Sequence, residues 1–393
     1  MNNLIHVDAY YRSLNHVGEE LCGDHVMIRR NEDGFIMVLA DGLGSGVKAS
    51  ILSTLTSTII SNMMVNGMPL EDAVETIAAT LPVCKERGIA YSTFAIINIL
   101  YNGETYIVEF DSPSITVIRD EEILKLDDEI KKISDRTVHT KKFIVEEGDY
   151  LISYSDGVLH AGTGMTLNFG WGEKEVNDFL LKVTKDDIEA RDVSRVLLAN
   201  ANSLYDGKPA DDTTVAVAKI VKAKNTVVMV GPPSKEEDDK KVVDILRRAT
   251  GKKICCGGTT SQIVARVMNK EVTTGNLLST AGDVPPIGYI DGINLVTEGV
   301  LTLQKANRLL TKAKDDREYE ENLIYSKKQD GAFKLVKELL NSTKVTFLVG
   351  LSDNPAHDSI HYSTISLNAK IALINEMKDS LLSLGKIVNI EMF

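Results

Sequence analysis

The sequence predicts an α+β fold over residues 1–222, followed by a smaller α/β domain over residues 226–393. In the first region, apolar strand-like runs follow one another as hairpins and are interrupted by two blocks of two helices each. In the second region, strands and helices alternate, which is the pattern of a parallel sheet with crossover helices. The length of 393 residues also fits two domains better than one.

Strands of the first region are expected where short apolar runs are bounded by Gly, Asn or Asp. They cover residues 6–13, 25–30, 34–40, 91–100, 104–110, 114–119, 123–126, 142–145, 150–154 and 213–221. Asn102-Gly103 predicts a hairpin turn, and residues 146–149 are expected to join the strands on either side of them in a second hairpin. Helices are expected over residues 47–64, 69–81, 173–181 and 192–203.

The elements of the second region follow from the same criteria. Strands are expected over residues 226–230, 253–256, 294–296, 344–350 and 386–390, and helices over 234–250, 259–268, 300–310, 333–341 and 369–384. Ser234 with Glu237, and Thr259 with Gln262, are capping boxes that predict where the first two helices begin. Residues 312–329 are rich in charge and are expected to form a solvated helix or loop.

Composition narrows the class of protein. The formal net charge of −12 argues against a nucleic-acid-binding protein, which normally has a basic face. No apolar run approaches the roughly 20 residues of a membrane-spanning helix, and the N-terminus lacks the basic and apolar segments of a signal peptide. The four cysteines form no CxxC pair and are expected to be reduced. These observations predict a cytoplasmic protein that binds neither nucleic acid nor membrane.

Four aspartates carry the chemical information: Asp24, Asp41, Asp156 and Asp211. Asp-Gly is a common turn pair, so one strand ending on it needs no further explanation. Two such pairs, plus an aspartate that leads into a strand, indicate a carboxylate cluster. Two carboxylates about 4 Å apart repel by about 4 kcal/mol at an effective dielectric of about 20, so a cluster needs cations. Because the ligands are all oxygens, Mg²⁺ or Mn²⁺ is favoured over zinc or copper.

Read in chain order, the short motifs around these aspartates resemble a known family. They are Gly23-Asp24, ADGLGSG at 40–46, STFA at 92–95, SPS at 112–114, SDGV at 155–158 and DDTTV at 211–215. This order resembles the metal-dependent type 2C protein phosphatases, and most of all their bacterial stage II sporulation E (SpoIIE) branch, over about residues 5–221. The resemblance implies a β-sandwich flanked by helices, with two Mn²⁺ or Mg²⁺ ions between the sheets.

The resemblance also implies a role for each site residue. Asp41 would bridge both ions, the Gly42 carbonyl would bind one of them, and Asp156 and Asp211 would complete the other. Asp24 would hold the outer ion through water. Asp41, Asp156 and Asp211 are thus the candidate catalytic residues of a serine/threonine phosphatase, in which water activated by two metal ions hydrolyses phosphoserine or phosphothreonine.

The resemblance extends to partners and regulation. The implied substrate is a phosphorylated bacterial signalling protein such as an anti-sigma-factor antagonist, and residues 47–64 and 69–81 match helices that act as a regulatory switch in that branch. A plain helical flank is the alternative for them. Eukaryotic relatives grip phosphate with an arginine, and Arg12 is the only arginine ahead of Asp24. A non-catalytic metal-binding sensor or scaffold with the same fold is the alternative function.

Two glycine-rich turns suggest further ligands. Gly42-x-Gly44-x-Gly46 also fits a dinucleotide-binding turn, but Asp41 would repel a pyrophosphate. In the second domain, residues 257–261 (GGTTS) follow a strand and open a helix, whose free N–H groups suit a small anion; an ordinary capping box is the alternative. Residues 295–299 repeat this geometry, so the two loops are expected to face each other across a switch point. A regulatory role is the hypothesis for this domain.

Overall fold

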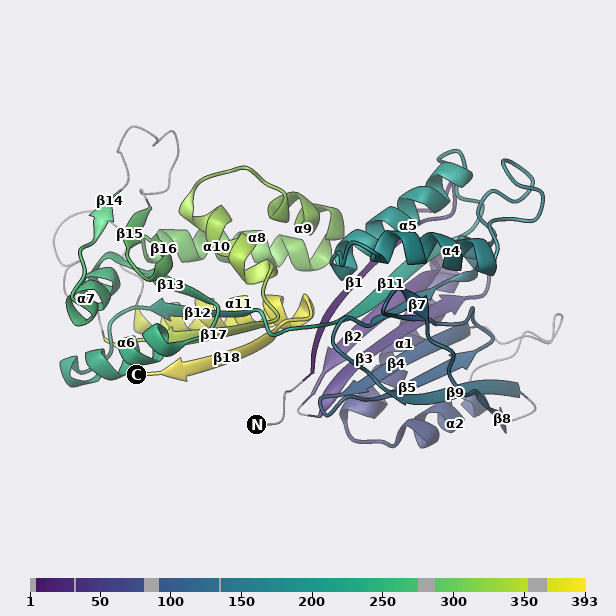
Figure 1. Cartoon of the computed structure of the whole chain (residues 1–393), viewed down its shortest axis with the longest axis horizontal. Helices are drawn as coiled ribbons and strands as arrows, with labels where there is room; N and C mark the ends of the chain where they lie inside the picture. The colour runs from purple at the N-terminus through teal and green to yellow at the C-terminus, as the bar shows by residue number, and fades with distance from the viewer. Residues whose placement is uncertain (1–4, 32, 81–91, 134–135, 275–286, 353–365) are drawn as a thin grey trace. The chain divides into compact units, whose positions relative to one another are not determined.

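The structure is a computed structural model that describes residues 5–31, 33–80, 92–133, 136–274, 287–352 and 366–393. The chain divides into two compact units, Met1–Lys222 and Ala223–Phe393 (Figure 1). Each unit contains its own sheets and its own buried apolar clusters.

Two antiparallel sheets form the first unit. The five-stranded sheet has the order β1 (His6–Leu14), β11 (Thr213–Val221), β10 (Tyr150–Tyr154), β6 (Thr116–Arg119), β7 (Glu122–Ile123). The six-stranded sheet has the order β2 (Asp24–Arg30), β3 (Gly34–Gly42), β4 (Ser92–Leu100), β5 (Glu104–Phe110), β9 (Arg136–Ile144), β8 (Glu129–Ile133). Met37 and Ile97 of the second sheet share one core with Leu151 and Ala216 of the first. The expected β-sandwich is therefore confirmed.

Helices cover the outer face of each sheet, as Figure 1 shows. The helices α4 (Glu173–Thr184) and α5 (Ala190–Leu204) pack on the five-stranded sheet, where Leu180 and Leu197 share one buried cluster with Ile152. The helices α1 (Gly46–Val65) and α2 (Leu70–Thr80) pack on the six-stranded sheet. A four-residue helix, α3 (Asp156–Leu159), directly follows β10.

The second expected hairpin is wrong. The strands β9 and β10 do not pair: β9 lies between β5 and β8, whereas β10 lies between β11 and β6 in the other sheet. Residues 145–149 therefore cross from one sheet to the other. Asp149 is buried at this crossing and accepts hydrogen bonds from the Arg119 guanidinium at 2.8 and 2.6 Å. Ion pairs of Arg119 with Glu146 and Asp149 thus hold the segment that was expected to be a hairpin turn.

The second unit contains a seven-stranded sheet in the order β14 (Thr273–Thr274), β15 (Gly288–Ile290), β16 (Ile293–Thr297), β13 (Lys252–Cys256), β12 (Asn225–Val230), β17 (Lys344–Val349), β18 (Ile387–Met392). The strands from β16 to β18 are parallel, and β14 and β15 form an antiparallel edge. The helices are η1 (Glu236–Asp238), α6 (Asp239–Arg248), α7 (Gly258–Met268), α8 (Val300–Asp315), α9 (Arg317–Ile324), α10 (Gly331–Leu340) and α11 (Leu367–Ser383). The expected α/β class is confirmed.

Three details of this unit differ from the expectations. Both capping boxes are wrong, because α6 and α7 begin after Asp238 and Gly257 without a hydrogen bond from a capping side chain. Residues 312–329 are not simply solvated, because α9 buries Leu323 and Ile324 in the main core of the unit. The switch point lies between β12 and β17; the loops after β13 and β16 are neighbours on one side of it.

Within the ranges given above, no helix is both long and apolar enough to cross a membrane. Cys22, Cys255 and Cys256 are unpaired, and the last two are buried. Cys84 lies outside the described residues.

Candidate metal centre

Strand register brings the four aspartates to one end of the sandwich. Asp24, the first residue of β2, pairs directly with Asp41 near the end of β3. In the other sheet, the end of β10 pairs with β11 near the start of that strand, at Tyr154 and Val215. Asp156 follows the first of these strands and Asp211 precedes the second, so they lie beyond adjacent strand ends.

The two pairs face each other across the sandwich, because a Cβ on Gly23 would lie only 2.6 Å from Asp212 Oδ2 of the other sheet's loop. Burial raises the pKa of Asp41, and the charges of Asp24, Asp156 and Asp211 raise it further. Burial likewise raises the pKa of Asp24, with the charges of Asp212 and Asp156 adding to it. Burial and then the charge of Asp156 raise the pKa of Asp211 to about 6. Carboxylates from both sheets therefore share one poorly solvated region.

Unpartnered oxygens in this region suit hard cations. Asp24 is only 5% exposed, and neither of its carboxylate oxygens has a hydrogen-bond partner of ordinary geometry, although the hydroxyls of Ser155 and Thr214 lie close enough to lower its pKa somewhat. Asp212 accepts the His16 backbone N–H at 2.9 Å through Oδ1, but its Oδ2 is buried and unpartnered. Buried carboxylate oxygens without donors are unfavourable alone and are the ligands that Mg²⁺ and Mn²⁺ prefer.

The side chains are not gathered around one point. Among the described residues, no group of three or more His, Cys, Asp or Glu side chains is arranged so that it could hold a metal ion as it stands. The residues thus fit a cation by donor type, burial and shared position, but their carboxylates would have to turn to share one.

Gly42 shows how the local sequence builds this end of β3. A Cβ on Gly42 would lie 2.1 Å from the Ala49 carbonyl oxygen, so only glycine lets α1 fold back so closely over the strand. The Gly42 N–H donates to the Gly23 carbonyl at 3.1 Å, which ties the two aspartate motifs together. Since β3 and β4 are antiparallel neighbours, this turn is not part of a βαβ unit, and the dinucleotide-binding alternative is wrong.

Several residues hold the aspartate loops in place, although no role was predicted for them from the sequence. The Tyr205 hydroxyl donates to the Gly157 carbonyl at 2.7 Å, and the Thr214 N–H donates to Ser155 Oγ at 2.8 Å. The backbone N–H of His16, which lies 196 residues away in the chain, donates to the Asp212 carboxylate. Ser155, Asp212 and Thr214 lie within the SDGV and DDTTV motifs, whereas no local sequence pattern marks Tyr205 or His16.

Arg12 does not lie on the side of its strand that faces the aspartates. It pairs with Val215 and alternates with neighbours on β1, so it shares the helix-covered face with Tyr10 and Leu14. Ser13, the next residue, faces inward and bonds Thr214 Oγ1 at 2.7 Å. Recognition of phosphate by Arg12 is therefore not supported by its position in the strand.

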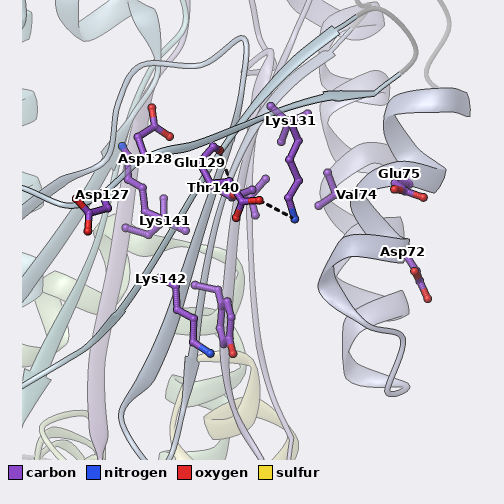
Figure 2. A pocket seen from close by; sticks show the side chains of 14 residues that line it. Asp72, Val74, Glu75, Asp127, Asp128, Glu129, Lys131, Thr140, Lys141 and Lys142 are labelled. Atoms are coloured by element: carbon purple, nitrogen blue, oxygen red, sulfur yellow. Dashed lines mark hydrogen bonds and ion pairs between the residues drawn. The ribbon is translucent and has the colours of Figure 1, made fainter.

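A cavity of about 790 Å³ lies elsewhere on the first unit, and none of the site aspartates lines it. It opens between α2 and the strands β5, β8 and β9 (Figure 2). Figure 2 shows Lys131 extending toward Glu129, 3.8 Å away, with Val74 of α2 on the opposite side. The cavity is separate from the carboxylate region.

The glycine turn of the second unit has the geometry of an uncapped helix start. Gly257 has a φ of +119° and precedes α7, which no side chain caps. The Ser261 hydroxyl donates to the Gly258 carbonyl at 2.7 Å instead. The Gly257 N–H donates to the Thr297 carbonyl at 2.9 Å, so this turn and the loop after β16 do lie side by side. The anion hypothesis for residues 257–261 stays a hypothesis.

Comparison with known proteins gives a family match for the first unit. Residues 31–221 match the family model of stage II sporulation protein E (SpoIIE). No curated protein sequence matches the chain.

Solved structures with a similar arrangement are distant in sequence. The type 2C phosphatase domain of Bacillus subtilis SpoIIE with a fragment of its regulatory domain is 19% identical, with a TM-score of 0.47, and the match covers 55% of this chain and 63% of that one. The RsbU and RsbW domains of a Mycobacterium tuberculosis protein are 15% identical, with a TM-score of 0.45 and coverages of 63% and 68%. RsbX in complex with magnesium is 19% identical, with a TM-score of 0.40 and coverages of 55% and 96%.

The match thus spans less than two thirds of the B. subtilis structure. The family model and the sandwich agree on the same part of the chain. Residues 31–221 are therefore a SpoIIE domain of the type 2C phosphatase family.

Proposed function

We propose that residues 1–222 act as a metal-dependent serine/threonine protein phosphatase on a bacterial signalling protein. The observation that carries this proposal is the meeting of carboxylates from both sheets at one end of the sandwich, where both oxygens of Asp24 are buried without partners. The SpoIIE family match supports it. Following the family pattern, the substrate class is a phosphorylated anti-sigma-factor antagonist.

Each site residue has a proposed task. Asp41, whose pKa is raised by the charges of the other three aspartates, would be the ligand shared by two Mn²⁺ or Mg²⁺ ions, and the Gly42 carbonyl would bind one of them. Asp156 and Asp211 would hold one ion from the other sheet, and Asp24 would hold the outer one through water. Such ions would lower the pKa of bound water and neutralise the oxygens of the phosphoryl group. Tyr205, through its bond to the Gly157 carbonyl, keeps the Asp156 turn in place.

The proposal predicts hydrolysis of p-nitrophenyl phosphate and of a phosphothreonine peptide only when Mn²⁺ or Mg²⁺ is present. Asp41→Asn and Asp211→Asn should each lower kcat/KM by at least about a hundredfold, because each removes a carboxylate ligand. Asp186→Asn, on an exposed residue outside the site, is the matched control. Calorimetric titration with Mn²⁺ provides a readout that does not depend on turnover.

Two outcomes would contradict the proposal in different ways. Equal hydrolysis in excess EDTA would exclude metal-dependent catalysis. Binding of Mn²⁺ that Asp41→Asn abolishes, without turnover of either substrate, would instead support the alternative of a metal-binding sensor or scaffold.

For residues 223–393 we propose a regulatory role, supported by their separation as a compact α/β unit. Phosphatase activity of the full chain should then differ from that of residues 1–222, and equal activity would argue against regulation. The anion proposed for residues 257–261 should raise the melting temperature of the full chain when inorganic phosphate is added at millimolar concentration. No shift would argue against it.

A further inference from the structure

A loop next to the candidate metal centre displays two large apolar side chains to solvent. It comprises residues 160–172, here named the Phe169 loop. Phe169 is 93% exposed and Met165 is 50% exposed. The loop follows α3, whose first residue is Asp156, so it leaves the site directly.

The Phe169 loop is firmly built. At its end, the Gly172 N–H donates to the Leu159 carbonyl at 3.0 Å, and in its middle the Thr166 hydroxyl donates to the Leu204 carbonyl at 2.7 Å. A Cβ on Gly170, whose φ is +82°, would lie 2.6 Å from the Leu159 carbonyl oxygen. The residue after it, Trp171, is only 9% exposed and contacts Phe179 edge to face. Since the backbone is fixed on both sides of Phe169, the exposed ring is a feature of the fold.

A second loop beside the site has the same character. In residues 15–23, Val17 is 52% exposed and Leu21 is 48% exposed. The Val17 N–H donates to the Pro209 carbonyl at 2.8 Å. The neighbouring His16 N–H donates to Asp212 Oδ1. The Phe169 loop bonds Leu204, so both loops are fastened to the segment 204–212, which contains Asp211. Two loops that are bonded to the segment containing Asp211 thus carry exposed apolar side chains.

We propose that the Phe169 loop, with Phe169 as its main contact and with Val17 and Leu21 on the neighbouring loop, docks the polypeptide that carries the phosphorylated residue. The substrate class is a phosphoserine or phosphothreonine segment with an apolar side chain near the phosphorylated residue. This inference rests on the proposed phosphatase function. It gives the enzyme a way to select its substrate through contacts outside the reacting group.

Three observations favour a substrate polypeptide over other occupants. The loop is continuous with the candidate site through Asp156 and α3. An exposed, backbone-fixed aromatic ring is the kind of side chain that dominates protein recognition, because it buries a large area at a small entropic cost. An anionic lipid surface is disfavoured by the net charge of −12 and by the acidic site itself.

The test uses the full chain and a series of phosphothreonine peptides that differ only in the position of one leucine. The native protein should prefer one leucine position by about tenfold in kcat/KM over the leucine-free peptide. Phe169→Ala should abolish that preference, measured as the ratio of peptide to p-nitrophenyl phosphate hydrolysis. Ile130→Ala, which changes a residue that is 61% exposed on β8 at the edge of the other sheet, should keep the preference.

Several results would overturn the docking proposal. The native protein could hydrolyse every peptide equally well, or Phe169→Ala could lower hydrolysis of both substrates equally, which would indicate a structural role. A change from dimer to monomer in Phe169→Ala, seen by light scattering, would assign the loop to contact with a second copy. If the native protein hydrolyses neither peptides nor p-nitrophenyl phosphate, the phosphatase function itself fails and docking fails with it.

Discussion

The helices α1 and α5 cover the outer faces of the two sheets of one sandwich, yet they do so in opposite ways. The buried face of α5 is apolar except for Ser194, and it includes Val193, Leu197 and Leu198. The buried face of α1 carries four hydroxyl side chains: Ser53, Thr56, Ser57 and Ser61. Its exposed face carries a stripe of large apolar residues, Val47, Ile51, Leu55 and Ile59, which are 44% to 62% exposed.

This difference indicates which of the two sheets that carry the aspartates is held more firmly by its covering helix. The hydroxyls under α1 bond mainly to their own helix, as Ser57 does to the Ser53 carbonyl at 2.8 Å, so they add little adhesion to the sheet. Apolar burial holds α5 against the sheet that positions Asp156 and Asp211. The aspartates Asp24 and Asp41 belong to the sheet under α1, where the buried apolar cluster has fewer members.

Removing an apolar anchor of α5 should have the largest effect on stability. Leu197 is fully buried on a helix that packs against β1 and β11, so Leu197→Ala should lower the free energy of unfolding by about 2–5 kcal/mol. Urea unfolding followed by circular dichroism measures it. A loss below about 1 kcal/mol would show that α5 is not held as described.

The pH dependence of the metal-free protein should report on the carboxylates. The pKa of Asp24 and of Asp211 is raised in the folded state, so the folded chain keeps protons that the unfolded chain has released. The stability that these two protonated carboxyl groups contribute is fully present below their unfolded pKa near 3.8. It is lost as pH rises through their folded pKa values, about 6 for Asp211 and about 7 for Asp24. Between about pH 5 and about pH 8, the free energy of unfolding in EDTA should fall by roughly 1–3 kcal/mol.

Two controls sharpen the pH experiment. Asp24→Asn, which is neutral at every pH, should flatten the dependence, and saturating Mn²⁺ should reduce it by stabilising the ionised carboxylates. A native protein that becomes more stable toward pH 8 in EDTA would contradict the shared carboxylate region.

A smaller effect is expected at the polar interface of α1. His25 Nδ1 and Ser57 Oγ are 2.7 Å apart, and burial lowers the pKa of His25. Ser57→Ala leaves the ring nitrogen without this partner and should cost about 1 kcal/mol of unfolding free energy. Ser50→Ala, on a half-buried serine of the same helix, is the matched control. Equal stability of Ser57→Ala and the native protein would show that this bond contributes nothing.

The smallest effect is expected on the exposed stripe of α1. Leu55 is 53% exposed, so Leu55→Ala should change the free energy of unfolding by less than about 0.5 kcal/mol. The same truncation in α5, at Leu197, serves as the comparison. A loss above about 1 kcal/mol at Leu55 would mean that the stripe is covered in solution.

Sequence patterns located strands that are mostly buried. Residues 104–110 and 213–221 form β5 and β11 with the expected bounds, because nearly every residue of these runs is buried. The strand β8 was missed because its sequence EIKKI is charged, as edge strands often are. The expected pairing of residues 142–145 with residues 150–154 was wrong, because the segment between them crosses to the other sheet. Asp149 in this crossover accepts a hydrogen bond from Arg119, and no local sequence pattern predicts that contact.

The candidate site could be predicted only in part, for a similar reason. The order of the motifs marked Asp24, Asp41, Asp156 and Asp211, and strand register brings their backbones together. Contacts between distant segments, such as that of His16 with Asp212, depend on how the two sheets pack and produce no periodic pattern in the sequence. The face of Arg12 was open to prediction, because alternation with Tyr10 and Leu14 along β1 decides it.

The direct pairing of Asp24 with Asp41 limits how this domain can vary in length. One residue inserted into either strand would move the following side chain to the opposite face and separate the pair. The turn at Asn102-Gly103 lies at the far end of β4, nine residues or about 30 Å from the aspartates. Insertions should therefore accumulate at that turn during evolution, and a reporter peptide or fluorescent label placed there should leave the aspartate end intact.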